Sequence, residues 1–388
     1  MRFDVVISGA AMSGATLALA LTRLAGKKVA VVDPHRPSKE HPGFDARSIA
    51  LSYGTIELLK RFQLWDALEE QASPIRTIHV SDKGHFGQTG FEADAMNKPY
   101  LGSVVELEKV GQSYFQLLEN EPEITLFCPD SVASVTQFQD KVEVGLSSGE
   151  TLEAELLVAA DGTRSKVAEL LKIPNQIEEL GQNALIANIE LAEPHQGQAF
   201  ERFTENGPLA LLPMTQQRMS LVWCLDDAQL AQATQWDDET FLAQLQQAFG
   251  WRLGKLVKVG SRFSYPLSLY TRERTIHHRI AFVGNAAQTL HPIAGQGFNL
   301  GIRDVATLTE VIAQSTDVGS YRCLSEYRSA REDDRNATVG MTTGWFAFSQ
   351  IIGRNSSWTK SRPNGLRYPD TGASMDNQQK FRIGKELV

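Results

Sequence analysis

Three small residues and one acid near the start of the chain have the types and spacing of a nucleotide site. Gly9, Ala11 and Gly14 follow a short apolar run, and Asp33 ends the next one. A dinucleotide site needs a tight turn, close backbone approach to a pyrophosphate, and an acid about 20 residues on for the ribose hydroxyls. The pattern predicts nucleotide binding, although the methyl group of Ala11 crowds the pyrophosphate. The alternative is a tight turn of an ordinary α/β protein.

Two later segments have residues that complete such a site. Asp161 and Gly162 follow an apolar run and precede Ser165, which by itself is the pattern of a common turn. Gly284 and Asn285 follow another apolar run. The glycine-rich stretch beyond them reads His291-Pro-Ile-Ala-Gly-Gln-Gly-Phe-Asn-Leu-Gly301. A helix that starts there offers free N–H groups and a positive dipole to an anion. Glycines also serve sharp turns, but beside the first motif this stretch favours a nucleotide site.

Strands and helix starts must position these residues. Short apolar runs predict strands at residues 3–7, 28–32, 124–128, 132–137, 141–147, 151–158 and 280–284. Segments rich in helix formers predict helices at 15–25, 53–70, 107–119, 238–249 and from about 297. Residues 34–52 are expected to form a polar loop. Between the apolar runs at 151–158 and 280–284, antiparallel strands are expected at 184–191, 199–203, 209–213 and 219–223. Further strands and turns are expected at 76–105. The order predicts an α/β fold interrupted by mixed insertions.

Composition and charge exclude several classes of protein. The chain has 388 residues, of which 42% are hydrophobic, and a formal charge of −8. These values are typical of a folded globular protein, and the acidic total argues against nucleic acid as the partner. No apolar stretch predicts a membrane span or a signal peptide. The three cysteines, Cys128, Cys224 and Cys323, lie far apart, so no disulfide and no metal site is expected.

The order of the motifs resembles that of the FAD-dependent aromatic hydroxylases, the flavoprotein monooxygenases of the para-hydroxybenzoate hydroxylase type. Longer segments are similar to the members of this family that hydroxylate polyprenylated methoxyphenols in ubiquinone biosynthesis. These segments are residues 41–51, 80–85, 199–204, 248–255 and 285–292. The resemblance covers residues 2–355 and implies a Rossmann-type FAD-binding domain with an interleaved β-sheet substrate domain.

The resemblance also implies roles for single residues. Gly9, Ala11 and Gly14 would hold the FAD pyrophosphate, and Asp33 the adenosine ribose. Arg47 would reach the phosphates or the flavin edge. The remaining cofactor residues are expected at the ribityl chain and the flavin pyrimidine: Asp161, Gly162, Asn285, Gly295, Gln296, Gly297 and Asn299. The candidates for the substrate pocket are Pro213, Trp223 and Pro292, although a Trp on a strand is more often core.

Two positions depart from the family pattern. Asn285 stands where the family has Asp, which removes a negative charge but keeps a hydrogen-bonding side chain. Ala168 stands where the segment after Asp161 has Arg in the family, which weakens any statement about NAD(P)H binding. His291 is expected to have a structural role, because the implied mechanism needs no particular base there.

The implied activity is a monooxygenase reaction in which FAD carries the chemistry. NAD(P)H would reduce the flavin, and O₂ would give a flavin C4a-hydroperoxide that hydroxylates a polyprenylated phenol. The alternatives are another ring position or aromatic substrate, a flavin-dependent prenyl reductase, and a non-catalytic lipid-binding module on the same fold. The expected location is the cytoplasm with peripheral contact at the inner face of the membrane, in a multi-enzyme ubiquinone-synthesis assembly.

The expected domain boundaries follow the changes in pattern. The FAD-binding domain is expected at residues 1–75, 106–179 and 276–352, and the substrate domain at 76–105 and 180–275. Residues 353–388 are expected to form an atypical, disordered tail with seven Lys and Arg against three Asp and Glu. The resemblance stops abruptly near residue 355, which motivates the hypothesis of a reading-frame change there.

Overall fold

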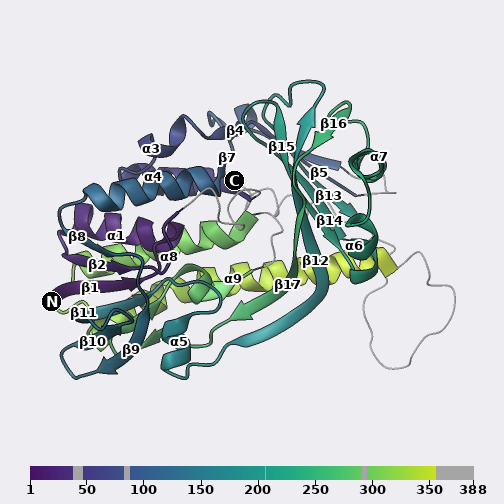
Figure 1. The fold of residues 1–388 in the computed structure, drawn as a ribbon. Helices are drawn as coiled ribbons and strands as arrows, with labels where there is room; N and C mark the ends of the chain where they lie inside the picture. Colours follow the sequence, from purple (N-terminus) through teal and green to yellow (C-terminus); the bar gives the residue numbers. More distant parts are fainter. Residues whose placement is uncertain (38–46, 83–87, 206, 291–294, 355–388) are drawn as a thin grey trace, which may run out of the picture.

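The computed structural model describes residues 1–37, 47–82, 88–205, 207–290 and 295–354. Two lobes lie side by side, each built on a large sheet, and a long helix runs from one to the other (Figure 1). Of the tail expected at residues 353–388, Gly353 and Arg354 lie at the end of a helix, and residues 355–388 lie outside the described residues, as do Pro292 and His291.

Sheet 1 forms the core of the first lobe, and its central strands are parallel because helices connect them. In the described part of the chain it has the order β18-β19-β11-β1-β2-β8, with β10 pairing β11 and β9 pairing β10. Its parallel strands are β1 (Arg2–Ser8), β2 (Val29–Val32), β8 (Ile124–Phe127), β11 (Thr151–Ala159) and β19 (Ile280–Phe282). Its antiparallel strands are β9 (Val132–Gln137), β10 (Val142–Leu146) and β18 (Ile276–His277).

Apolar side chains on both faces of sheet 1 are buried. One face packs against helices α1, α4 and α8, where Val5 and Val31 meet Leu17, Tyr114 and Val305. The other face is covered by the β9–β10 hairpin and the short helix α5. These helices are α1 (Met12–Ala25), α4 (Leu107–Asn120), α5 (Lys166–Leu170) and α8 (Gln296–Ala313). Burial on both faces explains why the strands read as continuous apolar runs.

Sheet 2 forms the second lobe. Among the described residues its order is β20-β17-β12-β15-β14-β13-β5-β6, with β16 pairing β12. Its strands are β5 (Thr77–Asp82), β6 (Gln88–Glu92), β12 (Gln176–Leu191), β13 (Gln198–Thr204), β14 (Gly207–Pro213), β15 (Arg218–Leu225), β16 (Leu256–Val259), β17 (Phe263–Thr271) and β20 (Gln288–Thr289). Its outer face packs on α6 (Asp227–Ala233) and α7 (Asp238–Phe249). Its inner face packs toward α8 and the third sheet.

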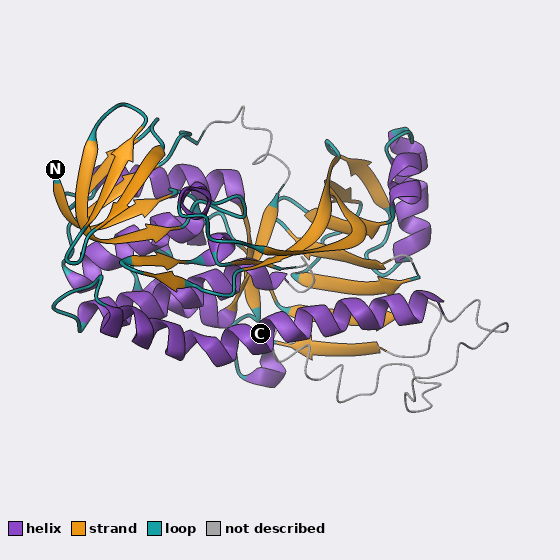
Figure 2. Cartoon of the chain, turned by 90° about the horizontal axis from the view of Figure 1, so that it is seen from below, coloured by secondary structure: helices purple, strands orange, loops and turns teal. Residues whose placement is uncertain are grey.

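Sheet 3 and one long helix connect the lobes. Sheet 3 consists of β3 (Ser48–Ser52), β7 (Gly102–Glu106) and β4 (Ser73–Ile75) in the described chain, and it packs against the inner face of sheet 2. Helix α9 (Tyr321–Arg354) starts against the first lobe and passes along sheet 2 (Figure 2). The remaining helical segments are α2 (Tyr53–Arg61), α3 (Asp66–Glu69), η1 (Asp94–Met96) and η2 (Gly284–Ala286).

The structure departs from the sequence expectations in a few elements. The helix expected at 53–70 is divided into α2 and α3, because Gln63 adopts a left-handed conformation with φ of 58°. The loop expected at 34–52 ends in strand β3. Helix α6 was not expected, although Asp226 and Gln229 form a capping box at its start. Within 76–105, β5 and β6 join sheet 2, whereas β7 joins sheet 3.

No helix within the described residues is long and apolar enough to cross a membrane.

Candidate active site

The three predicted motifs meet at one edge of sheet 1, at the ends of four neighbouring strands. Parallel strands present their carboxyl ends at the same edge, and β1, β2, β11 and β19 are neighbours in the sheet. Gly9 follows β1, Asp33 follows β2, Asp161 follows β11, and Gly284 follows β19. Ligands of open α/β sheets bind at this edge. The candidate site is therefore assembled from segments that lie far apart in the sequence, from Gly9 to Gly284.

Close packing explains the glycines of the first motif. Gly9 has a φ of 105°, and a Cβ on it would lie 2.5 Å from the carbonyl oxygen of Ala160. A Cβ on Gly14 would overlap the carbonyl oxygen of Gly9 and lie 3.2 Å from the Cβ of Ala160. The turn, the start of α1 and the end of β11 are therefore in direct contact, and only glycine fits at either position.

The start of helix α1 is open to an anion. Ala11 is its exposed N-cap residue, no side chain caps the helix, and its first turn has no acid. Its first N–H groups are therefore available to a phosphate. Asp33 lies beside this turn, where its Oδ2 accepts from the N–H of Ala10 at 2.6 Å and its Oδ1 from that of His35 at 2.8 Å. These bonds fix the carboxylate that a ribose would meet.

Asp161 carries a buried oxygen that no described residue satisfies. Its Oδ2 accepts from the N–H of Val167 at 3.1 Å and from the hydroxyl of Ser8 at 3.5 Å. Its Oδ1 is buried and accepts no hydrogen bond from the described residues. Burial raises the pKa of this carboxyl. Gly162 beside it has a φ of 80°, and a Cβ there would meet open space.

The second glycine motif packs directly on the first. A Cβ on Gly284 would lie 2.6 Å from the hydroxyl oxygen of Ser13, and a Cβ on Gly301 would lie 3.1 Å from the Cα of Gly284. The start of α1, the turn after β19 and the second turn of α8 therefore lie in direct contact. Asn285 is exposed at this junction, where its amide is able to bind a ligand hydroxyl.

The start of α8 faces the space between the lobes, and its predicted residues divide into two groups (Figure 1). Gly295 is the N-cap residue with a φ of 62°, and a Cβ on Gly297 would meet open space, so backbone is available here. The side chains of Asn299 and Gln296 are instead buried. Asn299 accepts from the N–H of Ser52 at 2.9 Å and donates to the carbonyl of Ala50 at 2.9 Å and to that of Gly295 at 2.8 Å. Asn299 thus ties β3 to α8.

Arg47 lies at the junction of sheets 2 and 3. Its carbonyl oxygen accepts from the N–H of Leu107, and its side chain is exposed. Burial raises the pKa of Tyr265 on β17, and the positive charge of Arg47 opposes that rise. The guanidinium is therefore near Tyr265, on the side of sheet 2 that faces α8.

A buried polar network between α8, β20 and α9 holds the loop that contains Gly284. The buried carboxylate of Asp304 on α8 accepts from the N–H of Gly284 at 3.2 Å, from Gln288 Nε2 at 2.9 Å and from Arg331 Nε at 2.9 Å. Arg335 donates to Gln288 Oε1 at 2.8 Å and to the carbonyl of Arg272. Three donors satisfy the Asp304 carboxylate, so the network restrains the loop in one conformation.

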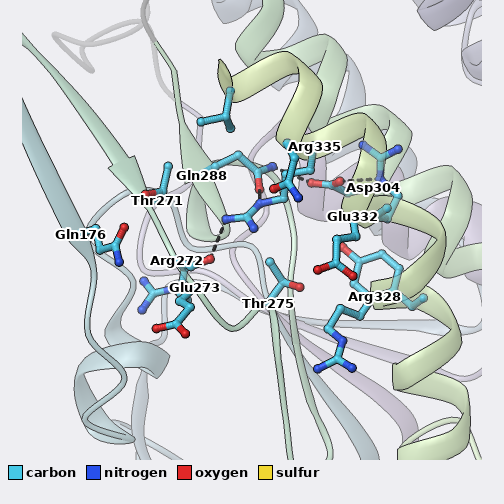
Figure 3. Close-up of a pocket in the computed structure, with 14 residues that line it drawn as sticks. Gln176, Thr271, Arg272, Glu273, Thr275, Gln288, Asp304, Arg328, Glu332 and Arg335 are labelled. Carbon is cyan, nitrogen blue, oxygen red and sulfur yellow. Dashed lines mark hydrogen bonds and ion pairs between the residues drawn. The ribbon is translucent and has the colours of Figure 1, made fainter. Parts of the chain in front are cut away.

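This network lines a cavity of about 330 Å³ between α9 and the β17–β18 connection. Figure 3 shows Arg335 of α9 pointing toward Gln288 and Arg272, with Asp304 also beside α9. Neither the glycines of the first motif nor Asp161 belong to its lining. The cavity therefore lies behind the candidate cofactor site and is distinct from it.

The three pocket candidates lie in different places. Trp223 is 6% exposed and packs on the outer face of sheet 2 with Trp236 and Phe241, under α6 and α7. It is core, as its place on a strand had suggested, and it does not face α8. Pro213 is buried at the end of β14, opposite Met219 in register. Pro292 lies outside the described residues.

The residues at the strand edge fit FAD. A helix start without a cap suits a pyrophosphate, glycines permit its close approach, and the unsatisfied Oδ1 of Asp161 suits a hydroxyl donor. An open backbone at Gly297 leaves room for a planar ring.

Comparison with known proteins agrees with this fit. The model of a protein family described as an FAD binding domain matches residues 2–342. The chain belongs to this family. Ubiquinone hydroxylase UbiL of Rhodospirillum rubrum is 37% identical over 349 residues, which cover 87% of this chain and 80% of that protein. The 3-demethoxyubiquinol 3-hydroxylase of Escherichia coli is 30% identical over 340 residues, which cover 85% and 86%.

Solved structures show the same fold. PqsL of Pseudomonas aeruginosa, titled a probable FAD-dependent monooxygenase, matches with a TM-score of 0.77 and 19% identity over 92% of this chain and 99% of that chain. HpxO of Klebsiella pneumoniae, solved with FAD and uric acid, matches with a TM-score of 0.67 and 18% identity over 100% and 92%. The protein is thus a flavoprotein monooxygenase that binds FAD, with a Rossmann-type lobe and a β-sheet lobe.

The sequence patterns do not mark the residues of the polar network around Asp304, which support the loop of Gly284. Asp304 and Arg331 lie inside helices, and Arg272 and Gln288 on or beside strands, so no motif marks them. Gly301 had a weak signal, because it ends the glycine-rich stretch.

Proposed function

We propose that the protein hydroxylates the ring of a polyprenylated phenol on the route to ubiquinone, with NAD(P)H as reductant and O₂ as oxidant. One observation carries the proposal. The 37% identity to a ubiquinone hydroxylase extends over 87% of the chain, so it includes sheet 2 as well as the FAD lobe. The lobe that would bind substrate is therefore related to that of a ubiquinone hydroxylase, along with the lobe that binds cofactor.

The site residues would divide the work of binding FAD. Gly9, Ala11 and Gly14 would hold the pyrophosphate at the start of α1, and Asp33 the adenosine ribose. Asp161, Gly162 and Asn285 would bind the ribityl chain, and Arg47 would lie at the flavin edge. The backbone of Gly295, Gln296 and Gly297 would face the flavin pyrimidine, while Asn299 would hold this backbone in place.

The protein's own part in catalysis is to position the cofactor and the substrate ring and to keep water away from them. When bound, FAD supplies electron transfer and activation of O₂. The N-terminus of α8 would stabilise negative charge that develops on the reduced cofactor. Sheets 2 and 3 would cover the reacting ring and exclude water. We also propose that sheet 1 carries the cofactor and sheet 2 the substrate, and that the protein contacts the membrane surface to receive its lipid.

Reconstitution tests the proposal directly. Protein purified with FAD should consume O₂ and NAD(P)H in the presence of a prenylated methoxyphenol, and mass spectrometry should show a product heavier by one oxygen atom. A saturated prenyl chain in the product would instead indicate a reductase.

Quinone profiling provides the matched test in cells. A deletion strain should accumulate a ubiquinone precursor that lacks one ring hydroxyl, and the intact gene should restore ubiquinone. Normal ubiquinone in the deletion strain contradicts the proposal.

A further inference from the structure

Glu201 lies on the inner face of sheet 2. Side chains alternate along β13, so Glu201 shares a face with Ala199 and Phe203. Those two pack with Ile78, Val80 and Met214 toward sheet 3, whereas Phe200 packs with Phe249 on the outer face. The inner face is the one that meets the FAD lobe.

This face leads directly to the start of α8. Leu212, two residues beyond Ala210 on β14, packs in the same cluster as Ala50 of β3. A Cβ on Gly295 would lie 3.3 Å from the Cβ of Ala50. Glu201 pairs with Ala210 in the β13–β14 register. Glu201 therefore lies on the same face of sheet 2 as Leu212, whose cluster includes Ala50. Ala50 is the neighbour of Gly295, beside which the flavin ring would lie.

The Glu201 side chain is buried, and no partner among the described residues holds its carboxyl. The residue is 7% exposed, and no hydrogen bond or ion pair from a described residue reaches its side chain. Its neighbours in register are Val80 and Ala210. Burial raises its pKa to about 8. A carboxyl with a structural role would be hydrogen-bonded, because burial of an unpaired polar group costs stability.

Few other charged groups are near it. Burial raises the pKa of the Cys224 thiol on β15, and the negative charge of Glu201 raises it further. Asp82 lies two residues beyond Val80 on the same face of β5. Helix α9 passes β13 and β14, but its sequence from 341 to 353 has no titratable side chain. Among the described residues, burial is the influence that sets the pKa of Glu201, and no cation contributes to it.

We propose that Glu201 is the base that accepts the proton of the substrate's ring hydroxyl. This inference rests on the proposed function. An apolar wall with a buried carboxyl suits a prenylated phenol, because the prenyl chain needs apolar contacts and the hydroxyl needs an acceptor. A group whose pKa lies near the working pH is an effective base.

The proton transfer balances over one turnover. The ring O–H bond breaks and a carboxyl O–H bond forms on Glu201, which leaves an electron-rich phenolate. The ring then takes one oxygen atom of O₂ as a hydroxyl group, at a carbon that loses its hydrogen as a proton. The two electrons of NAD(P)H and two protons reduce the other oxygen atom of O₂ to water. The ring oxygen regains a proton from Glu201, so the carboxylate is restored.

The test compares wild-type holoenzyme with Glu201→Gln, which keeps the size of the side chain. The probes are 2-methoxy-6-farnesylphenol and its methyl ether, which has no proton to lose. Wild type should bind the phenol with a phenolate absorbance that increases as the pH rises through 8. Glu201→Gln should lack this absorbance and should hydroxylate the phenol about 10²- to 10⁴-fold more slowly. Its FAD content and its rate with the ether should match those of wild type.

Glu190→Gln is the matched control, since Glu190 is an exposed glutamate on β12 of the same sheet. It should behave as wild type. An active wild type beside an equally active Glu201→Gln, with the same pH profile, overturns the role of Glu201 alone. A wild type that binds FAD but converts no prenylated phenol overturns the proposed function, and the role of Glu201 with it. Equal losses with the phenol and with the ether assign Glu201 a structural role and also overturn the inference.

Discussion

At the scale of single residues, the cofactor site depends on glycines that cannot carry a side chain. In Gly14→Ala the new Cβ would overlap the carbonyl of Gly9, so α1 must move away from the turn. We expect the purified variant to lose most of its flavin and about 1–3 kcal/mol of unfolding free energy. The ratio of flavin to protein absorbance and thermal unfolding measure these effects.

Gly54→Ala is the control for this substitution. A Cβ on Gly54 in α2 would meet open space, so its flavin content should be normal and its stability unchanged or raised by about 0.5–1 kcal/mol. If Gly14→Ala were as yellow and as stable as Gly54→Ala, the close packing described for the turn would be wrong.

Glu201 should also make stability depend on pH. Its pKa is about 8 in the folded protein, against an ordinary value of 4.5 for a glutamate. Between these values the folded state binds more protons than the unfolded state, so its contribution to the unfolding free energy falls as the pH rises. Glu201→Gln removes this contribution and should gain up to about 4–5 kcal/mol relative to wild type between pH 5 and pH 9. Urea unfolding at several pH values measures the gain, and parallel curves would refute it.

Single residues differ in how well the sequence predicts them. Gly9, Gly14 and Asp161 stand in motifs whose spacing follows from the geometry of a strand–turn–helix unit. Glu201 and Asp304 stand in a strand and a helix of ordinary composition. Their importance comes from burial and from neighbours that are distant in sequence, which a single sequence does not reveal.

At the scale of elements, Asn299 and Asn285 should behave differently although both belong to the predicted site. Asn299→Ala removes two hydrogen bonds between β3 and α8 and a third to Gly295 at the start of α8, and we expect a loss of about 2–4 kcal/mol in unfolding free energy. Asn285 is exposed, so Asn285→Ala should retain its stability and bind FAD more weakly. Urea unfolding and FAD titration separate the two effects. Similar stability of the two variants would contradict the structural role of Asn299.

Most elements could be predicted from their patterns, and the exceptions have local causes. The strands of sheet 1 are buried on both faces and therefore read as apolar runs. The break between α2 and α3 depends on one left-handed residue, Gln63, which no propensity marks. Strand β7 resembles the strands beside it in sequence, and only its partners β3 and β4 place it in sheet 3.

At the scale of the whole molecule, FAD should stabilise the fold, because its site joins segments from three parts of the chain. Binding raises the unfolding free energy by about 2.7 kcal/mol at a concentration of 100 times Kd. The melting temperature should therefore rise with FAD concentration. Riboflavin lacks the pyrophosphate that the α1 turn would bind, so it should raise the melting temperature much less. An equal shift with riboflavin would argue against binding at this turn.

The interleaved order of the chain also bears on how the protein is made. Strand β19 completes the edge of sheet 1 beside β11, yet more than a hundred residues that build sheet 2 separate the two in sequence. A ribosome that adds about 5–20 residues per second needs roughly 15–60 s to reach the start of α8. Until then the sheet of β1, β2 and β11 has an unpaired edge at β11. An unpaired edge is prone to aggregation and is a target for chaperones. The cofactor site is thus complete only after α8 has been made, when bound FAD would hold β19 and α8 against the strands made earlier.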